Sequence, residues 1–424
     1  MNPDTGAVCL GLVLLTPLAA AGLTLINAGL GRSRNAAHAM LASLSVASVA
    51  ALVYAVVGFC WQGIPGVPGR MITLGGKTWD WLGAGGVFLS GVDWNSPTAL
   101  AVVLGMFSAG IAAMIPLGSG ADRWRLGAAC ASAAMVAGLT FPVFAHWAWG
   151  VGSLAQCGRL AGLGRGFLDA GGAGAIQVTG GLTALAVTWI LGPRRGKYTA
   201  DGMPSALPGH NAVIVLLGCF LAWVGWIGLG GAGAILLLGE GASRVALIAV
   251  NTTLGAASAA LVAAGITRVR FGKTDASLSA NGWIGGLVAS SAGCSLMRPA
   301  GAMLVGIVAG ALVVYSVEWL ELHLRIDDPA GAISVHGFAG IWGLLAAGFL
   351  TPGAAEGQWI AQLAGVGTLV GFVLPVSYGF NRVLNKFYPL RVAAEGERQG
   401  LDLFELGAGA YPDFVSHNED FWQR

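Results

Sequence analysis

Long apolar stretches limit how this chain can fold more than any other feature. Eleven uncharged stretches of about 20 residues occur along it, and each is long enough to cross a bilayer as a helix. Only 10% of the residues are charged, against about a quarter in a soluble domain. We therefore predict an all-α polytopic membrane protein with transmembrane helices near 8–30, 36–62, 98–118, 126–149, 170–193, 211–238, 245–267, 276–297, 299–317, 330–352 and 358–381.

The basic residues predict an orientation. Alternate connections between the predicted helices collect 16 of the 22 Lys and Arg residues on one side of the membrane. Because cytoplasmic loops carry an excess of basic residues, we expect a cytoplasmic (inner) membrane protein with its N-terminus outside and its C-terminus inside. The net charge of +2 gives no reason to expect a nucleic-acid partner.

A glycine-rich segment occurs twice. The stretch DAGGAGAIQVTGGLTAL begins at Asp169, and DPAGAISVHGFAGIWGL begins at Asp328. The two copies open the fifth and tenth predicted helices, so they enter the membrane from opposite sides. This arrangement is typical of inverted repeats, whose functional site lies near mid-depth at their interface. Gln177 and His336 hold the same place in the two copies, and we expect them to meet there.

The repeat also predicts the organisation of the chain. We expect a transmembrane domain over 1–388, with inverted halves at about 5–193 and 210–352 and an eleventh helix at about 358–387. A cytoplasmic tail follows at 389–424.

Each polar residue also has an ordinary structural interpretation. Gln177 or His336 could simply hydrogen-bond a neighbouring helix, and Asp169 and Asp328 are expected as helix N-caps. Trp149 lies in FAHWAWG at an outer helix end, where an interfacial aromatic belt is the usual role.

Enzyme chemistry has little support in the sequence. Metalloprotease, nucleophile-elbow and phosphate-loop motifs are all missing, and we expect no metal and no cofactor. The remaining polar groups are one imidazole, one amide and several hydroxyls among apolar helices. They suit a pore or binding site for a small, weakly polar or singly charged solute.

Motifs in order along nearly the whole chain resemble the Amt/Rh ammonium transporters. They are GLTLINAGLGRSRN (22–35), GADRWR (120–125), HWAWG (146–150), FLDAGGAGAIQVTGG (167–181), VGWIGLGGAGA (224–234), VNTT (250–253), DDPAGAISVHGFAGIWG (327–343) and the tail from 390. The resemblance implies eleven helices in two inverted halves, ammonium or ammonia as solute, and one pore in each protomer of a homotrimer.

The resemblance also implies pore residues. An outer recruitment site would use Trp149 and the supporting Asp169, but its serine falls on Gly233. The two stacked phenylalanines of the gate fall on Ser108 (with Phe107 adjacent) and Leu229. Further pore positions fall on Trp226 and Ser291.

The mid-pore histidine pair of that family is altered in this chain. His336 is present, and Gln177 replaces its partner. Two imidazoles can relay a proton, whereas an amide does not titrate near neutrality. We therefore expect an atypical ammonium channel or transporter.

Two alternatives remain open at this stage. The chain could be a sensor that binds ammonium without transport, or it could pass another small neutral solute or a monovalent cation. The tail resembles one that meets the PII signal protein, and a solvated anchor on the cytoplasmic loops is its simpler interpretation.

Overall fold

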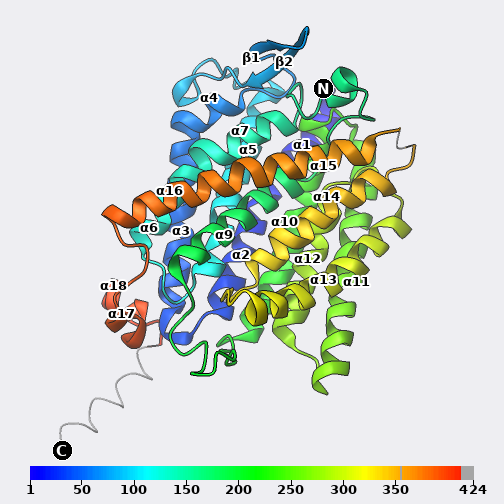
Figure 1. The fold of residues 1–424 in the computed structure, drawn as a ribbon. Coiled ribbons are helices and arrows are strands. Elements are labelled where there is room, and N and C mark those ends of the chain that lie inside the picture. Colours follow the sequence, from blue (N-terminus) through cyan, green and yellow to red (C-terminus); the bar gives the residue numbers. More distant parts are fainter. Residues whose placement is uncertain (354–355, 412–424) are drawn as a thin grey trace, which may run out of the picture.

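Ten helical segments among the described residues, 1–353 and 356–411, are long and apolar enough to cross a membrane in the computed structural model. They stand side by side in one bundle (Figure 1). They are α1 and α2 (Pro3–Leu15, Pro17–Leu30), η1, α3, η2 and α4 (Ser33–Asn35, Ala36–Val53, Tyr54–Gly58, Phe59–Gln62), α5 (Pro97–Gly120), α6, η4 and α7 (Leu126–Met135, Val136–Thr140, Phe141–Ala148), η5 and α9 (Ala173–Val178, Thr179–Leu191), α10 (Ala212–Leu237), η6 and α11 (Ala242–Arg244, Val245–Phe271), α13 (Pro299–His323), η7 and α14 (Ile333–Phe338, Ala339–Leu350), and α15, η8 and α16 (Gln358–Thr368, Leu369–Val373, Leu374–Phe387).

The eighth predicted helix is shorter than expected. It is α12 (Ala276–Ser291), with 16 residues, and a turn replaces the rest of the predicted stretch 276–297. It packs against α10, α11, α13 and α14, so it lies among the ten longer segments. The all-α polytopic fold is thereby confirmed.

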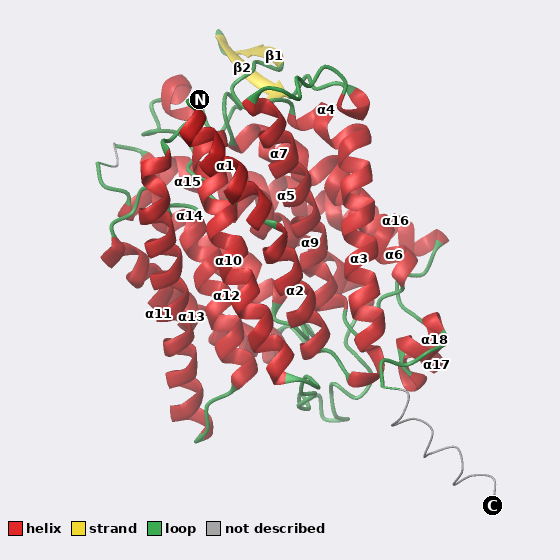
Figure 2. Ribbon diagram, turned by 180° about the vertical axis from the view of Figure 1, so that it is seen from behind, coloured by secondary structure: helices red, strands yellow, loops and turns green. Residues whose placement is uncertain are grey.

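The two ends of the bundle differ. The N-terminus and a β-hairpin, β1 (Arg70–Leu74) and β2 (Lys77–Leu82), lie at one end, and the C-terminal segment lies at the other (Figure 2). We call these ends the hairpin face and the tail face. The short helices η3 (Val87–Leu89) and α8 (Cys157–Ala161) occur in connections between membrane segments.

The C-terminal segment folds back on the bundle. Helices α17 (Ala394–Gln399) and α18 (Leu401–Leu406) follow α16, and α18 packs against η1 and α3. The Asp402 carboxylate accepts hydrogen bonds from the backbone N–H groups of Ala37 and His38, at 3.2 and 2.7 Å. These N–H groups belong to the first turn of α3, so the tail supplies that helix with an N-cap. The rest of the predicted tail, 412–424, lies outside the described residues.

Candidate functional site

Gln177 and His336 meet inside the bundle. Gln177 Oε1 lies 2.8 Å from His336 Nδ1, although 159 residues separate them in sequence. Both side chains are buried, with 0% and 4% of their surface exposed. The expected contact between the two repeat copies is therefore present.

Local backbone geometry is the same in the two copies. Gly172 and Gly331 have φ angles of 77° and 70°, the left-handed region that glycine adopts without strain. Each precedes a wide turn with i→i+5 hydrogen bonding, η5 or η7, and these turns carry Gln177 and His336. Such turns are frequent at functional sites because they break the regular helix.

A close glycine contact sets the distance between the two copies. A Cβ atom on Gly181 would lie 2.4 Å from the backbone nitrogen of Gly337. Only a residue without a side chain permits this approach, which is the way small residues act at membrane helix crossings. The crossing lies one turn beyond Gln177 and directly after His336, so it holds their side chains within hydrogen-bonding distance.

The hydrogen bond determines which atoms of the pair donate and which accept. Gln177 Oε1 can only accept, so His336 Nδ1 donates and the neutral imidazole retains Nε2 as its acceptor. Gln177 Nε2 is buried and has no partner. The pair therefore offers one free donor and one free acceptor to a bound molecule.

Asp169 caps η5, as predicted. Its Oδ2 accepts from the N–H groups of Gly174 and Ala175 at 3.0 and 2.9 Å, and its Oδ1 is buried without a partner. Asp328 makes the equivalent bonds at the start of η7. Both carboxylates therefore bond free N–H groups at the start of their helices, as predicted, although Gly172 and Ala332 hold the N-cap positions.

Trp149 anchors the segment that begins at Asp169. Its indole Nε1 donates to the Asp169 carbonyl at 2.9 Å, and only 4% of its surface is exposed. Phe144, His146 and Trp147 are also buried. The belt interpretation of FAHWAWG is therefore wrong, because the hairpin and its flanking loop cover this end of α7.

Gly233 and Ser291 also touch this segment. A Cβ on Gly233 would lie 2.3 Å from the Ala170 carbonyl oxygen, so the backbone occupies the space where a serine side chain would begin. The backbone carbonyl oxygen of Ser291 accepts a hydrogen bond from the Gly171 N–H at 2.9 Å. The Ser291 hydroxyl donates to the carbonyl oxygen of Leu287. Trp149, Asp169, Gly233 and Ser291 are therefore brought together.

The four remaining predicted residues lie on α5 and α10. Ser108, Trp226 and Leu229 are buried, and Phe107 is partly buried. Ser108 Oγ and Trp226 Nε1 have no hydrogen-bond partner. These two polar atoms inside an apolar bundle remain available to a small solute or to water.

Sequence reasoning missed one polar pair at the hairpin face. His146 Nε2 lies 3.0 Å from Asp80 Oδ1, and Nδ1 lies 2.9 Å from the Gln62 carbonyl oxygen. Asp80 and His146 are 4% and 6% exposed. A single acid between two tryptophans, in TWDWL, was the available signal.

A buried ion cluster joins the loops of the tail face. Asp327 accepts three hydrogen bonds from Arg194, at 2.8, 2.9 and 3.0 Å, and its Oδ2 lies 3.9 Å from Arg123 Nη1. Burial alone would raise the pKa of Asp327, but the hydrogen bonds of Arg194 and the charges of Arg123 and Arg194 lower it to about 2. Asp327 is therefore ionised at neutral pH.

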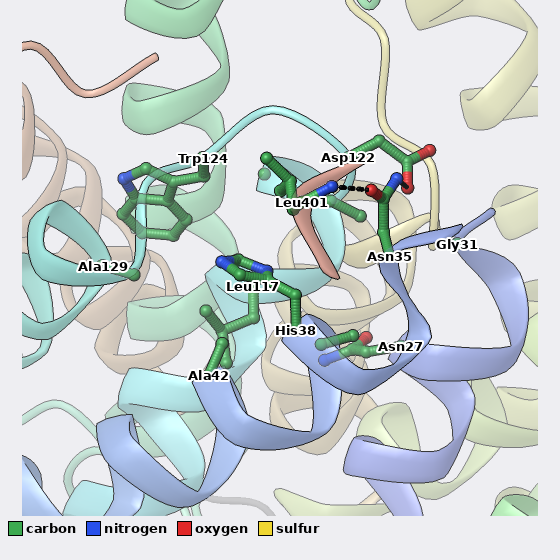
Figure 3. Close-up of a pocket in the computed structure, with 13 residues that line it drawn as sticks. Asn27, Gly31, Asn35, His38, Ala42, Leu117, Asp122, Trp124, Ala129 and Leu401 are labelled. Carbon is green, nitrogen blue, oxygen red and sulfur yellow. Dashed lines mark hydrogen bonds between the residues drawn. The ribbon is translucent and has the colours of Figure 1, made fainter. Parts of the chain in front are cut away.

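A small cavity separates the tail from the bundle. Figure 3 shows Asn27, His38, Trp124 and Leu401 around it, with the Leu401 N–H donating to Asn35 Oδ1 at 2.6 Å. Its volume of about 30 Å³ has room for roughly two water molecules. Asn27 Nδ2 and Trp124 Nε1 are buried without partners, so water in this cavity would satisfy them.

The fold and the buried polar pair define a polytopic membrane protein with a polar centre deep inside its helices. The chain belongs to the Ammonium Transporter Family, whose profile matches residues 7–411. This membership confirms the resemblance predicted from the motifs. Members of the family are transporters rather than enzymes.

Individual relatives agree with the family assignment. The chain is 36% identical to ammonium transporter Amt2 of Archaeoglobus fulgidus, over 93% of this chain and 85% of that protein. It is 33% identical to ammonium transporter Amt2 of Haloferax mediterranei, over 94% and 88%. Two relatives from different archaea thus match nearly end to end.

Solved structures share the fold. A Sensor Amt Protein superposes with a TM-score of 0.83 at 29% identity, covering 95% of this chain and 98% of that one. Mep2 of Candida albicans superposes with a TM-score of 0.77 over 97% and 91%. At 23% identity, the second likeness concerns the fold alone.

Proposed function

We propose that this protein moves ammonia, taken from ammonium, across the cytoplasmic membrane through a pore in which Gln177 and His336 meet. The observation that carries the proposal is their buried 2.8 Å hydrogen bond, with Gln177 Nε2 left unpartnered. The ammonium transporters among its relatives support the choice of solute.

The hydrogen-bonding chemistry of the pair favours the neutral solute. Ammonia has one lone pair and three N–H groups, so it can accept from Gln177 Nε2 and donate to His336 Nε2. Ammonium has no lone pair and cannot accept from the amide. A cation beside the amide N–H of Gln177 would also meet a donor rather than an acceptor, which makes its burial there costly.

The amide also interrupts proton transfer. A histidine passes a proton by gaining one at one ring nitrogen and losing one at the other, and an amide side chain does not do this near neutral pH. We therefore expect the proton of ammonium to stay on the side from which the solute enters. Transport would then carry little charge.

The test compares uptake with current in proteoliposomes. Uptake of radiolabelled methylammonium and the current after an ammonium jump are measured for the wild type, Gln177→His and the control Gln399→His, which lies on the exposed surface of α17. We expect wild-type uptake with little current, and a current per molecule about tenfold larger in Gln177→His. An equally large wild-type current would contradict the proposed role of the amide.

A sensor is the second candidate function. The likeness to a Sensor Amt Protein over 98% of that chain and the altered pair favour it. Saturable ammonium binding together with uptake no greater than that of protein-free vesicles would support the sensor and contradict transport.

The charge count and the resemblance support further parts of the proposal. We propose that the hairpin face is outside, the tail face is cytoplasmic, and the protein is a homotrimer. A PII-type partner for the tail belongs to the same proposal. The mass of the detergent-solubilised protein tests the trimer. Co-elution of added PII protein with the full chain tests the partner.

A further inference from the structure

A tight turn follows α4 at the hairpin face. Its sequence is IPGV, residues 64–67, and the Val67 N–H donates to the Ile64 carbonyl oxygen at 3.0 Å. Pro65 and Gly66 hold the two central positions, and Gly66 has a φ of 83°. Proline followed by a glycine with positive φ is typical of a type II turn. The local sequence therefore makes this turn compact and stiff.

The turn covers a small pocket beside Trp149. All four of its residues line this pocket, and the other lining residues are Gln62, Ala145, His146, Trp149 and Val151. The pocket has a volume of about 10 Å³, which is room for roughly one water-sized molecule. A Cβ atom on Gly150 would lie 2.7 Å from the backbone nitrogen of Gly66, so the turn rests directly on the chain next to Trp149. Trp149, to which the resemblance assigns recruitment of the solute, is only 4% exposed.

Packing rather than hydrogen bonding holds the turn in place. Among the described residues, 64–68 make a single hydrogen bond, and it lies within the turn itself. Ile64 is partly buried and packs against the core, whereas residues 66–68 are exposed. The other walls of the pocket are fixed more firmly, because α7 is helical and the Gln62 carbonyl oxygen lies 2.9 Å from His146 Nδ1. The turn is therefore the wall that moves at the lowest cost.

We propose that residues 64–68 form a lid, which closes the pocket at Trp149 and moves away as a unit to admit the solute from the hairpin face. Its two ends stay attached, because the N–H groups of Gly63 and Gly69 donate to α4 and to β2 at 2.8 and 2.9 Å. The motion rotates the backbone between these two glycines and breaks apolar contacts, chiefly those of Ile64. This inference rests on the proposed function, since it takes the transported solute as the molecule that enters, but the opening of the lid is measured without transport.

Chemical labelling of a thiol inside the pocket measures how often the lid opens. Ala145→Cys places this thiol on the pocket wall, where the alanine is 0% exposed. A methanethiosulfonate reagent with a trimethylammonium group is too large for the closed pocket, so it reacts only while the lid is open. Mass spectrometry of the peptide that contains position 145 separates this label from the six native cysteines. We expect slow labelling, and labelling about tenfold faster when Ile64→Ala is added, because the lid then loses its apolar anchor. Ile72→Ala, which removes a partly buried side chain from β1, is the matched control and should leave the rate unchanged.

Gly150→Ala gives an independent test of the same lid. The new methyl group would collide with the backbone of Gly66, so we expect the lid to be displaced and labelling to be faster. Gly91→Ala also places an alanine at a positive φ, 81° against 66° for Gly150, but its methyl group would meet nothing within 4 Å; labelling should not change.

Two results would overturn the lid. One is labelling at position 145, with the native turn in place, as fast as that of Asp93→Cys at an exposed position. The other is a labelling rate that neither Ile64→Ala nor Gly150→Ala increases. Both results count against the lid whether or not the vesicles take up methylammonium. Faster labelling in these variants without any uptake would leave the lid in place and contradict transport alone.

Discussion

Removing the charge of Asp327 should destabilise the tail face. Asp327→Asn preserves the shape of the side chain but leaves Arg194 and Arg123 buried with one counter-charge fewer. The new amide would also point N–H groups at the guanidinium of Arg194. Breaking a buried ion pair by changing one partner costs about 3–5 kcal/mol. Because Arg194 keeps its 3.0 Å bond to Asp122, we expect the lower figure, about 3 kcal/mol.

The lowered pKa of Asp327 gives a second value for how much this carboxylate stabilises the fold, and it also gives the direction of the pH dependence. Asp327 has its pKa lowered from 3.8 to about 2, so it stabilises the fold above its ordinary pKa by about 2 kcal/mol. This stability is fully present above about pH 4 and is lost as the pH falls towards 2. Asp327→Asn has no such carboxylate, so its stability should approach that of the wild type over this interval.

Thermal unfolding in detergent between pH 7 and pH 2.5 measures both effects. With about 2.1 cal/mol/K of unfolding entropy per residue, a loss of about 3 kcal/mol lowers the midpoint by roughly 3 °C in a chain of 424 residues. Asp93→Asn is the matched control, because it removes an exposed acid. The reasoning would be refuted if Asp327→Asn had the same unfolding midpoint as the wild type at pH 7. It would also be refuted if the difference between the two midpoints stayed constant below pH 4.

Three other substitutions test separate contacts. Gly181→Ala places a methyl group 2.4 Å from the Gly337 nitrogen. We expect the free energy of unfolding to fall by about 1–3 kcal/mol, measured by thermal melting, and methylammonium uptake to be lost in a flux assay. Gln362→Leu removes three hydrogen bonds, two of them to Leu168, and should lower the melting midpoint and raise the half-saturating solute concentration. Asp402→Asn weakens the cap on α3 by about 1 kcal/mol, and faster tryptic cleavage in the tail measures it. Normal uptake in Gly181→Ala would contradict the glycine contact as the feature that positions the pair.

The helical part of the fold could be predicted because a bilayer imposes a simple rule. Each crossing helix must satisfy its own backbone and present an apolar surface, so apolar stretches mark the membrane segments. The repeat allowed the Gln177–His336 contact to be predicted as well. The two caps followed from the position of Asp169 and Asp328 just before their helices.

The hairpin face could not be predicted in the same way. An aromatic cluster such as FAHWAWG has the same composition whether lipid headgroups or protein cover it, and the cover comes from residues 63–97, far away in sequence. The pair of glycines between Leu74 and Lys77 was a usable sign, since both have positive φ angles of 58° and 74° and such pairs favour hairpin turns. Nothing in the sequence joined Asp80 to His146.

Two positions at which the resemblance predicts another residue lie along one short segment. Gly233 leaves room for the carbonyl of Ala170, and Gln177 lies seven residues further along the same chain. The Gln177 side-chain carbonyl accepts from His336, and Gln177 Nε2 and Trp226 Nε1 are two buried donors without a partner that could donate to the lone pair of ammonia. Under the proposed transport of ammonia, the free Gln177 amide would donate to the solute and would not pass on its proton.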